Sequence, residues 1–261
     1  MKQKIVAQNK EHLQKLIQKE IKKHGLDCDL NHIDTSLITD MSHLFENSEF
    51  NGNISQWNTS QVNNMSMIFS YSDFDGDISQ WNTSNAVNMS YMFYHSSFNG
   101  DISGWNTSNA VNMEAVFSKS KFNQDISSWN TSKVENMSCL FYESQFNTDI
   151  SQWNTSKVKN MGAMFSYSSF NQDISAWDVS QVECMNSMFL YSNFKGDLSN
   201  WKPYKLQSML NMFFSCDAPT TYWGKIKNTE QRIDAIKSHH QKETLEDILT
   251  TSIPKTITLK I

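Results

Sequence analysis

The chain has 261 residues, with 22 basic and 27 acidic side chains and a formal net charge of −5. No stretch approaches the roughly 18 consecutive apolar residues of a membrane-spanning helix, so the sequence predicts no transmembrane segment. The first ten residues contain lysines but no apolar segment typical of a secretion signal, which makes the cytoplasm the expected location.

Charge divides the chain into three parts. Residues 1–28 carry seven lysines against three acids, residues 29–220 carry eight lysines against nineteen acids, and residues 221–261 carry seven basic against five acidic residues. An acidic centre would repel phosphates, which excludes nucleic acid as the expected partner. It remains compatible with a basic protein partner.

Residues 1–28 predict an N-terminal cap. Apolar positions share one stripe over residues 4–24, lysines occupy the other side, and Gly25 suits the helix end. We expect an amphipathic helix that seals the first repeat, while its basic face leaves open the alternative of contact with a membrane surface. The apolar positions are Ile5, Val6, Leu13, Leu16, Ile17 and Ile21.

A 24-residue repeat dominates residues 29–220. Methionines from Met41 to Met209 and phenylalanines from Phe50 to Phe194 keep this spacing without an insertion. Eight units result, with an atypical first and last member, as expected of end repeats that present one face to water. The most regular row is Trp57, Trp81, Trp105, Trp129, Trp153, Trp177 and Trp201.

Each unit has two halves. An Asp-Ile-Ser-x-Trp run predicts a short strand, and the spacing of Val62, Met65, Ile68 and Phe69 after Ser60 predicts a helix of about two turns. Strands pair at ~4.8 Å and helices pack at ~8–10 Å, so such a stack would have to curve. We therefore expect an α/β repeat solenoid, a curved stack of eight strand-plus-short-helix units with helical caps at both ends.

The unit carries a family resemblance. Val-x-x-Met-x-x-Met-Phe-x-x-Ser-x-Phe-Asn-x-Asp-Ile-Ser-x-Trp-Asn-Thr-Ser resembles the repeat of BspA-like leucine-rich-repeat proteins, and more narrowly the Mycoplasma-type Asp-Ile-Ser-x-Trp repeat. The likeness covers about 190 residues. It implies a curved solenoid without an active site and, for many relatives, a surface or adhesion role.

Residues 221–261 predict a second cap. Asn228 to Thr250 has the pattern of one or two helices, with Asn228 and Gln231 in capping-box spacing. The apolar face would be formed by Ile233, Ile236, Leu245, Ile248 and Leu249. The alternating tail Thr256–Ile261 is typical of an edge strand.

Two polar rows repeat with the unit. The row that starts at Asn58 and the row that starts at Asp77 are expected to bond backbone N–H groups at turns, and calcium coordination is the alternative for the second row. The sequence has no HExxH motif, no zinc spacing, no P-loop and no GxGxxG motif. We expect no catalytic residue, no metal and no cofactor.

Positions that vary from unit to unit should face solvent and offer binding residues. The predicted function is non-catalytic protein–protein interaction, in one version an immunity or inhibitor protein that sequesters a basic partner. A BspA-like surface adhesin and a membrane-surface-associated scaffold are the alternatives. The partner-binding candidates are Gln56, Gln80, Ser128, Gln152, Asn200, Tyr71, His95, Tyr94, Tyr142, Tyr167 and Tyr191.

Overall fold

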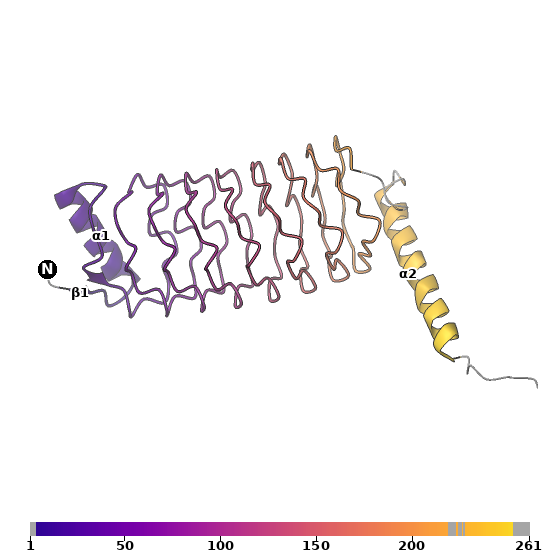
Figure 1. Cartoon of the computed structure of the whole chain (residues 1–261), viewed down its shortest axis with the longest axis horizontal. Coiled ribbons are helices and arrows are strands. Elements are labelled where there is room, and N and C mark those ends of the chain that lie inside the picture. Colours follow the sequence, from indigo (N-terminus) through magenta and orange to yellow (C-terminus); the bar gives the residue numbers. More distant parts are fainter. Residues whose placement is uncertain (1–3, 219–222, 224–225, 227, 253–261) are drawn as a thin grey trace, which may run out of the picture.

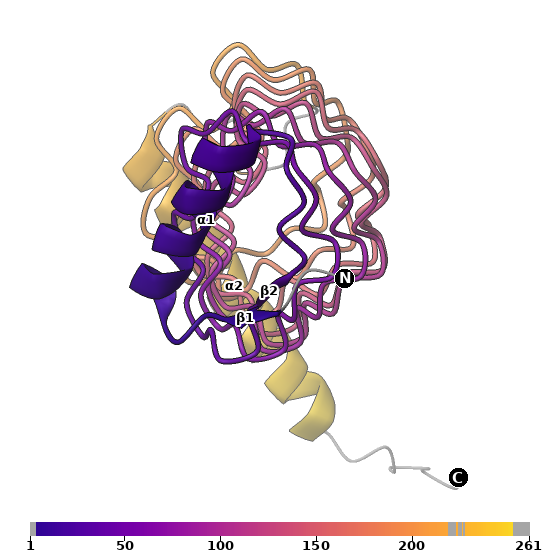
Figure 2. The same ribbon diagram turned by 90° about the vertical axis from the view of Figure 1, so that its left-hand side faces the viewer.

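The chain between its two long helices winds in successive 24-residue coils that lie side by side along one axis (Figure 1). From the end of the stack the coils superimpose as rings, with α1 on the near side (Figure 2). The four regular elements are β1 (Ile5–Val6), α1 (Lys10–His24), β2 (Ile33–Asp34) and α2 (Thr229–Ser252). The computed structural model describes residues 4–218, 223, 226 and 228–252.

The N-terminal helix starts later than the sequence pattern predicts. The side chain of Asn9 accepts the His12 N–H at 2.9 Å and caps α1, so the helix cannot extend back to residue 4. Ile5 instead belongs to β1, which pairs in parallel with β2, with Ile5 opposite Ile33. Leu13, Leu16 and Ile17 of α1 are buried, as predicted for a cap.

The C-terminal segment contains one long helix, α2. The side chain of Asn228 accepts the Gln231 N–H at 3.0 Å, which confirms the predicted N-terminal capping contact. Ile233 and Ile236 are buried, whereas Leu245 is 60% exposed and does not contribute to the predicted apolar face. The tail 256–261 and the side chains of Ile248 and Leu249 lie outside the described residues.

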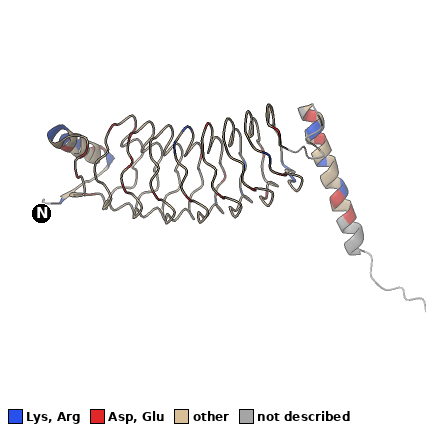
Figure 3. Cartoon of the chain, turned by 45° about the horizontal axis from the view of Figure 1, so that its top comes forward, with Lys and Arg blue, Asp and Glu red and all other residues tan. Residues whose placement is uncertain are grey.

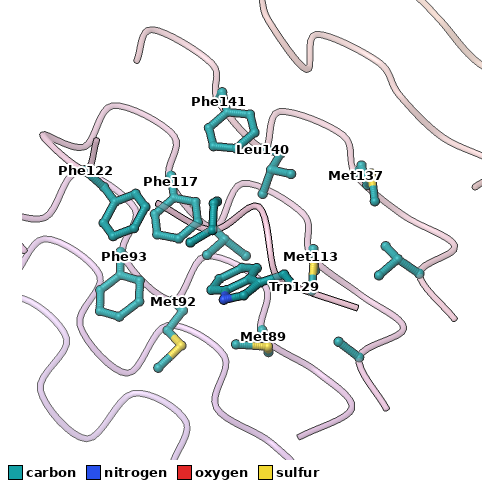
Figure 4. Packing of buried hydrophobic residues seen from close by; sticks show 14 of the residues in the cluster. Met89, Met92, Phe93, Met113, Phe117, Phe122, Trp129, Met137, Leu140 and Phe141 are labelled. Atoms are coloured by element: carbon teal, nitrogen blue, oxygen red, sulfur yellow. The ribbon is translucent and has the colours of Figure 1, made fainter. Parts of the chain in front are cut away.

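The repeated apolar rows fill the interior of the coils, which confirms their predicted place in the core. Phe117 lies 4.1 Å from Phe122, 5.8 Å from Trp129 and 5.9 Å from Phe141 between ring centroids, so each ring contacts its own coil and the next one (Figure 4). The indole N–H of each tryptophan from Trp57 to Trp201 donates to a backbone carbonyl of the preceding coil, as the indole of Trp129 does to the Ile102 carbonyl at 3.1 Å.

The short helix predicted in each unit is wrong. In the coil of residues 53–76, the N–H groups of Met65, Met67, Phe69 and Tyr71 donate to carbonyls of the next coil at 2.8–3.0 Å. Met67 and Tyr71 have left-handed backbone conformations, with φ of 55° and 52°, and the same two positions are left-handed in all eight units. Left-handed residues four apart interrupt an α-helix, so the 3.6-residue spacing reflects inward turns.

The predicted strand is also misplaced. The Asp-Ile-Ser-x-Trp run forms a tight turn, because the Trp81 N–H donates to the Ile78 carbonyl at 3.1 Å. This turn points both Ile78 and Trp81 inward although they are three residues apart. Parallel pairing occurs instead as single bridges at the position before each methionine, such as Asn64 with Asn88.

The predicted curvature loses its physical basis once the helices are absent from the described coils. Every side of a coil meets the next coil through backbone bonds and stacked side chains, so no layer requires the wider spacing of helices. The stack accordingly runs along one direction in Figure 1 and does not bend round into a horseshoe.

Candidate interaction surface

Exposed aromatic side chains gather at the end of the inter-coil hydrogen-bonded segment. Tyr71 packs edge-on against Tyr94 of the next coil at 5.1 Å and stacks with His95 at 5.0 Å between ring centroids. Tyr91 adds an edge contact to Tyr94 at 5.7 Å and donates its hydroxyl to Glu114 at 2.7 Å. The structure therefore brings together three of the predicted partner-binding residues at the N-terminal half of the stack.

A second group continues the same row toward the C-terminus. Tyr142 contacts Tyr167 at 6.0 Å, Tyr167 stacks on Tyr191 at 5.0 Å, and Tyr191 meets Phe214 at 5.4 Å between ring centroids. Between the two groups, Lys119 lies 5.6 Å from the centre of the Tyr142 ring and 3.5 Å from Glu143. We call this surface the aromatic face, and its members are Tyr71, Tyr94, His95, Tyr142, Tyr167, Tyr191 and Phe214.

Two tyrosines of the aromatic face have raised pKa values. Hydrogen bonding to Tyr71 and burial raise the pKa of Tyr94 to about 12, and hydrogen bonding to Glu143 and burial raise the pKa of Tyr142 to about 12. Tyr71, Tyr167 and Tyr191 are each about half exposed, at 47–48%. Large, rigid and half-exposed rings of this kind are enriched at protein interfaces.

The left-handed backbone at this row is a property of the coil and does not by itself mark a binding site. The position of Tyr71 is equally left-handed where it is occupied by Lys119 or Glu143. In each case the residue's own N–H donates to the next coil, as Lys119 does to Tyr142 at 2.7 Å. What distinguishes the aromatic face is the choice of side chain at these positions.

The glutamine row forms a separate polar strip. Gln56, Gln80, Gln152 and Asn200 are exposed. Gln80 and Gln152 each bond the hydroxyl of the preceding serine, at 3.3 and 3.2 Å. Ser128 is tied differently, since its hydroxyl donates to the Ser103 carbonyl of the preceding coil at 2.7 Å. The rings on the aromatic face contact one another, whereas the polar strip makes local bonds.

Six exposed carboxylates border the polar strip. Each accepts the N–H of the serine two residues later, at 2.8–2.9 Å, which confirms the predicted turn capping. Those bonds lower the pKa of Asp77, Asp101, Asp125 and Asp173. We call this row the acidic strip, and its members are Asp77, Asp101, Asp125, Asp149, Asp173 and Asp197.

Asparagines support the coils in two ways. The row from Asn58 accepts serine N–H groups within its own turn, as predicted, for example from Ser60 at 3.1 Å. A second row, which sequence reasoning missed, bonds from coil to coil: Asn99 Oδ1 accepts the Asn123 N–H at 2.9 Å. Its signal was present in the sequence as another polar position with 24-residue spacing. The second row is Asn51, Asp75, Asn99, Asn123, Asn147 and Asn171.

Within the described residues, no group of three or more His, Cys, Asp or Glu side chains could hold a metal ion. A depression of about 460 Å³ lies beside the polar strip, lined among others by Asp173, Lys195, Asp197 and Asn200. Charged residues are sparse along the coils and denser on the two helices (Figure 3).

The sequence period and the stacked coils define the class first: this is a repeat protein. The model of the family described as "Mycoplasma protein of unknown function, DUF285" matches residues 12–125, 73–168 and 117–226 in three overlapping copies. The chain belongs to this family. No curated protein and no solved structure matches the chain. None of the described helices is both long enough and apolar enough to cross a bilayer.

Proposed function

We propose that this repeat protein is a non-catalytic binding scaffold in the cytoplasm that recognises another protein through its aromatic face. The observation that carries the proposal is the run of half-exposed rings from Tyr142 to Phe214, in which each ring contacts the next across four coils. Because stacked coils already fix these rings, binding loses little side-chain entropy.

A basic partner surface is the chemistry that the charge distribution favours. Residues 29–220 hold nineteen acidic side chains against eight lysines, and backbone N–H groups of serines lower the pKa of Asp77 and Asp125 in the acidic strip. Complementary charge speeds encounter and selects the partner. An immunity or inhibitor role, in which the chain sequesters a basic protein, is the specific version of this proposal.

The alternative is an adhesin related to BspA-like leucine-rich-repeat proteins. The Asp-Ile-Ser-x-Trp unit supports this relationship, and an adhesin would use the same exposed rings toward a host or neighbouring-cell molecule. Protease treatment of intact source cells separates the two roles. Cleavage of the protein from outside would support the adhesin, whereas protection until lysis would support the cytoplasmic scaffold.

Affinity capture with mass spectrometry tests the proposed function. The wild-type chain should retain a specific partner that a Tyr167→Ala/Tyr191→Ala variant loses, because the variant removes two exposed rings without opening the core. A Gln80→Ala/Gln152→Ala variant is the matched control on the polar strip and should retain the partner. Equal retention by both variants would exclude the aromatic face as the binding surface.

A further inference from the structure

The last coil, residues 197–218 of the described chain, ends the stack with backbone donors that bond no other described residue. In the coil before it, the N–H groups of Met185, Ser187, Phe189 and Tyr191 donate to the last coil at 2.8–2.9 Å. The equivalent N–H groups of the last coil have no acceptor among the described residues. They belong to Met209, Asn211, Phe213 and Ser215.

One carbonyl completes this edge. The Glu183 carbonyl accepts two N–H groups of the last coil, from Gln207 at 2.8 Å and from Ser208 at 3.1 Å. The equivalent carbonyl of Gln207 receives no donor within the described part of the chain. The edge thus presents four donors and one acceptor in the same pattern by which every earlier coil binds its successor. We call residues 207–215 the open edge.

The helix α2 closes a different side of the last coil. Glu243 accepts from Lys202 at 2.6 Å and from the Tyr204 hydroxyl at 2.9 Å, and His240 stacks on Tyr204 at 3.7 Å between ring centroids. The inward side of the open edge is covered as well, since Phe213 packs against the buried Trp223 at 6.0 Å. These contacts of α2 therefore cover the turn at residues 202–204, and Trp223 covers the core side of Phe213.

The outward side of the open edge carries two of the most exposed large apolar side chains of the described coils. Leu210 is 59% exposed and Phe214 is 53% exposed. In the earlier coils the position of Leu210 holds a small or polar residue that is buried or half-buried. The residues are Ser42, Ser66, Ser90, Glu114, Ser138, Gly162 and Asn186. Backbone donors that bond no other described residue, beside exposed apolar side chains, form a template for another backbone segment.

We propose that the open edge binds an extended segment of a partner protein, which pairs in parallel with residues 207–215 and covers Leu210 and Phe214 with apolar side chains. The segment would add one more layer to the stack, as strand addition does at sheet edges. This inference rests on the proposed binding function and extends it, because Phe214 belongs to both the aromatic face and the open edge.

A second copy of this chain fits the open edge less well. Two open edges facing each other would bring four donors against four donors. The opposite end of the stack is covered by α1 (Figure 1). Lys10 of α1 contacts Asp40 at 3.3 Å and Ser42 at 2.5 Å. A separate extended segment has no such obstacle, because every second carbonyl of an extended strand points to the same side and can meet the donors of the open edge.

Amide hydrogen exchange on the full chain tests the proposal, with a synthetic peptide of residues 63–72 as the probe. In the stack, the carbonyls of this segment accept the backbone N–H groups of the preceding coil. In the free protein the amides of Met209, Asn211, Phe213 and Ser215 should exchange much faster than those of Met185, Ser187, Phe189 and Tyr191. Saturating peptide should slow the four open-edge amides at least about tenfold.

Two variants serve as controls. A Leu210→Lys/Phe214→Lys variant should lose the protection by peptide, whereas Tyr167→Ala/Tyr191→Ala should keep it, which separates the open edge from the rest of the aromatic face. Slow exchange of the four amides in the free protein would overturn the proposal, because the chain itself would then cover the edge. Protection that depends on protein concentration alone would identify a second copy as the occupant, and unchanged exchange with peptide would also overturn the proposal.

Discussion

At the residue scale, the most unusual feature is the left-handed backbone at sixteen positions that are not glycine, two in each unit. Left-handed conformations cost an ordinary residue roughly 1–2 kcal/mol. The inter-coil bonds offset that cost, because each left-handed residue up to Tyr191 donates its N–H to the next coil. A substitution to glycine at such a position keeps the bond and removes the strain.

Ala163 tests this balance. Its φ is 53°, so Ala163→Gly should leave the free energy of unfolding unchanged or raise it by up to about 1 kcal/mol. Ala86 is the matched control, since it is fully buried and has no positive φ, and Ala86→Gly should lower the stability by about 1–2 kcal/mol. Urea unfolding measures both. Equal destabilisation would contradict a left-handed Ala163.

The acidic strip should make the stability of the fold depend on pH. Serine N–H bonds lower the pKa of Asp77, Asp125 and Asp173 in the folded chain. Their contribution is therefore complete above the ordinary aspartate value of ~3.9 and is lost as the pH falls through the lowered folded values. An Asp77→Asn/Asp125→Asn/Asp173→Asn variant should lose less stability in acid, while the neutral-pH fold persists.

Asn53 provides the natural precedent for this substitution. It occupies the same position in its unit and accepts the Ser55 N–H at 3.1 Å without a titrating group. Thermal unfolding between neutral and strongly acidic pH would compare the variant with the wild type. If the variant lost stability in acid as steeply as the wild type, these three carboxylates would not be the cause of the pH dependence of stability.

At the scale of one coil, the aromatic interior dominates stability. Phe117 is fully buried between Phe93 and Phe141, at 5.8 and 5.9 Å between ring centroids. Phe117→Ala should lower the free energy of unfolding by about 3–5 kcal/mol. Gln152→Ala on the polar strip should change it by less than ~0.5 kcal/mol. Denaturant unfolding that gave similar losses at both positions would mean that the interior of the coil is wrongly assigned.

The sequence alone predicts the coil's contents better than its path. Rows such as Trp57 to Trp201 identify the interior because only burial requires large apolar side chains at every repeat. The path was mispredicted because positions 62, 65, 68 and 69 suit both a helix and a series of inward turns. No sequence signal announces the left-handed backbone of Met67, since glycine, its usual marker, is absent there.

The sequence also predicts the candidate site only in part: it indicates which residues are exposed, but not which of them touch. Variation between units identified the exposed positions of Tyr71, Tyr167 and Tyr191. It did not reveal which rings touch, because contacts such as Tyr71 with Tyr94 depend on the lateral offset between coils. The open edge could not be predicted from the sequence either, because the strand was expected in the Asp-Ile-Ser-x-Trp half of the unit and the inter-coil hydrogen bonds lie in the other half. Hydrogen-bond direction is a property of the three-dimensional path.

At the scale of the whole molecule, identical contacts between neighbours imply that coils are interchangeable. Stability of such a stack approximates a sum over units and their interfaces. Deletion of residues 101–124 removes one full unit and joins Gly100 to Asp125 in the original register. We expect this variant to unfold cooperatively at a lower denaturant concentration than the wild type, because one interface is lost. Tyr94 would then face the coil of Tyr142.

Deletion of residues 101–112 is the matched control, because it removes half a unit and leaves a coil of twelve residues. Its apolar side chains can no longer meet the rows on either side, and the inter-coil donors lose their acceptors. Tryptophan fluorescence during urea unfolding should show a broad transition or none. If instead the two deletions were equally stable, the 24-residue register would not govern stacking. If both were unfolded, each coil would depend on specific neighbours and the units would not be interchangeable.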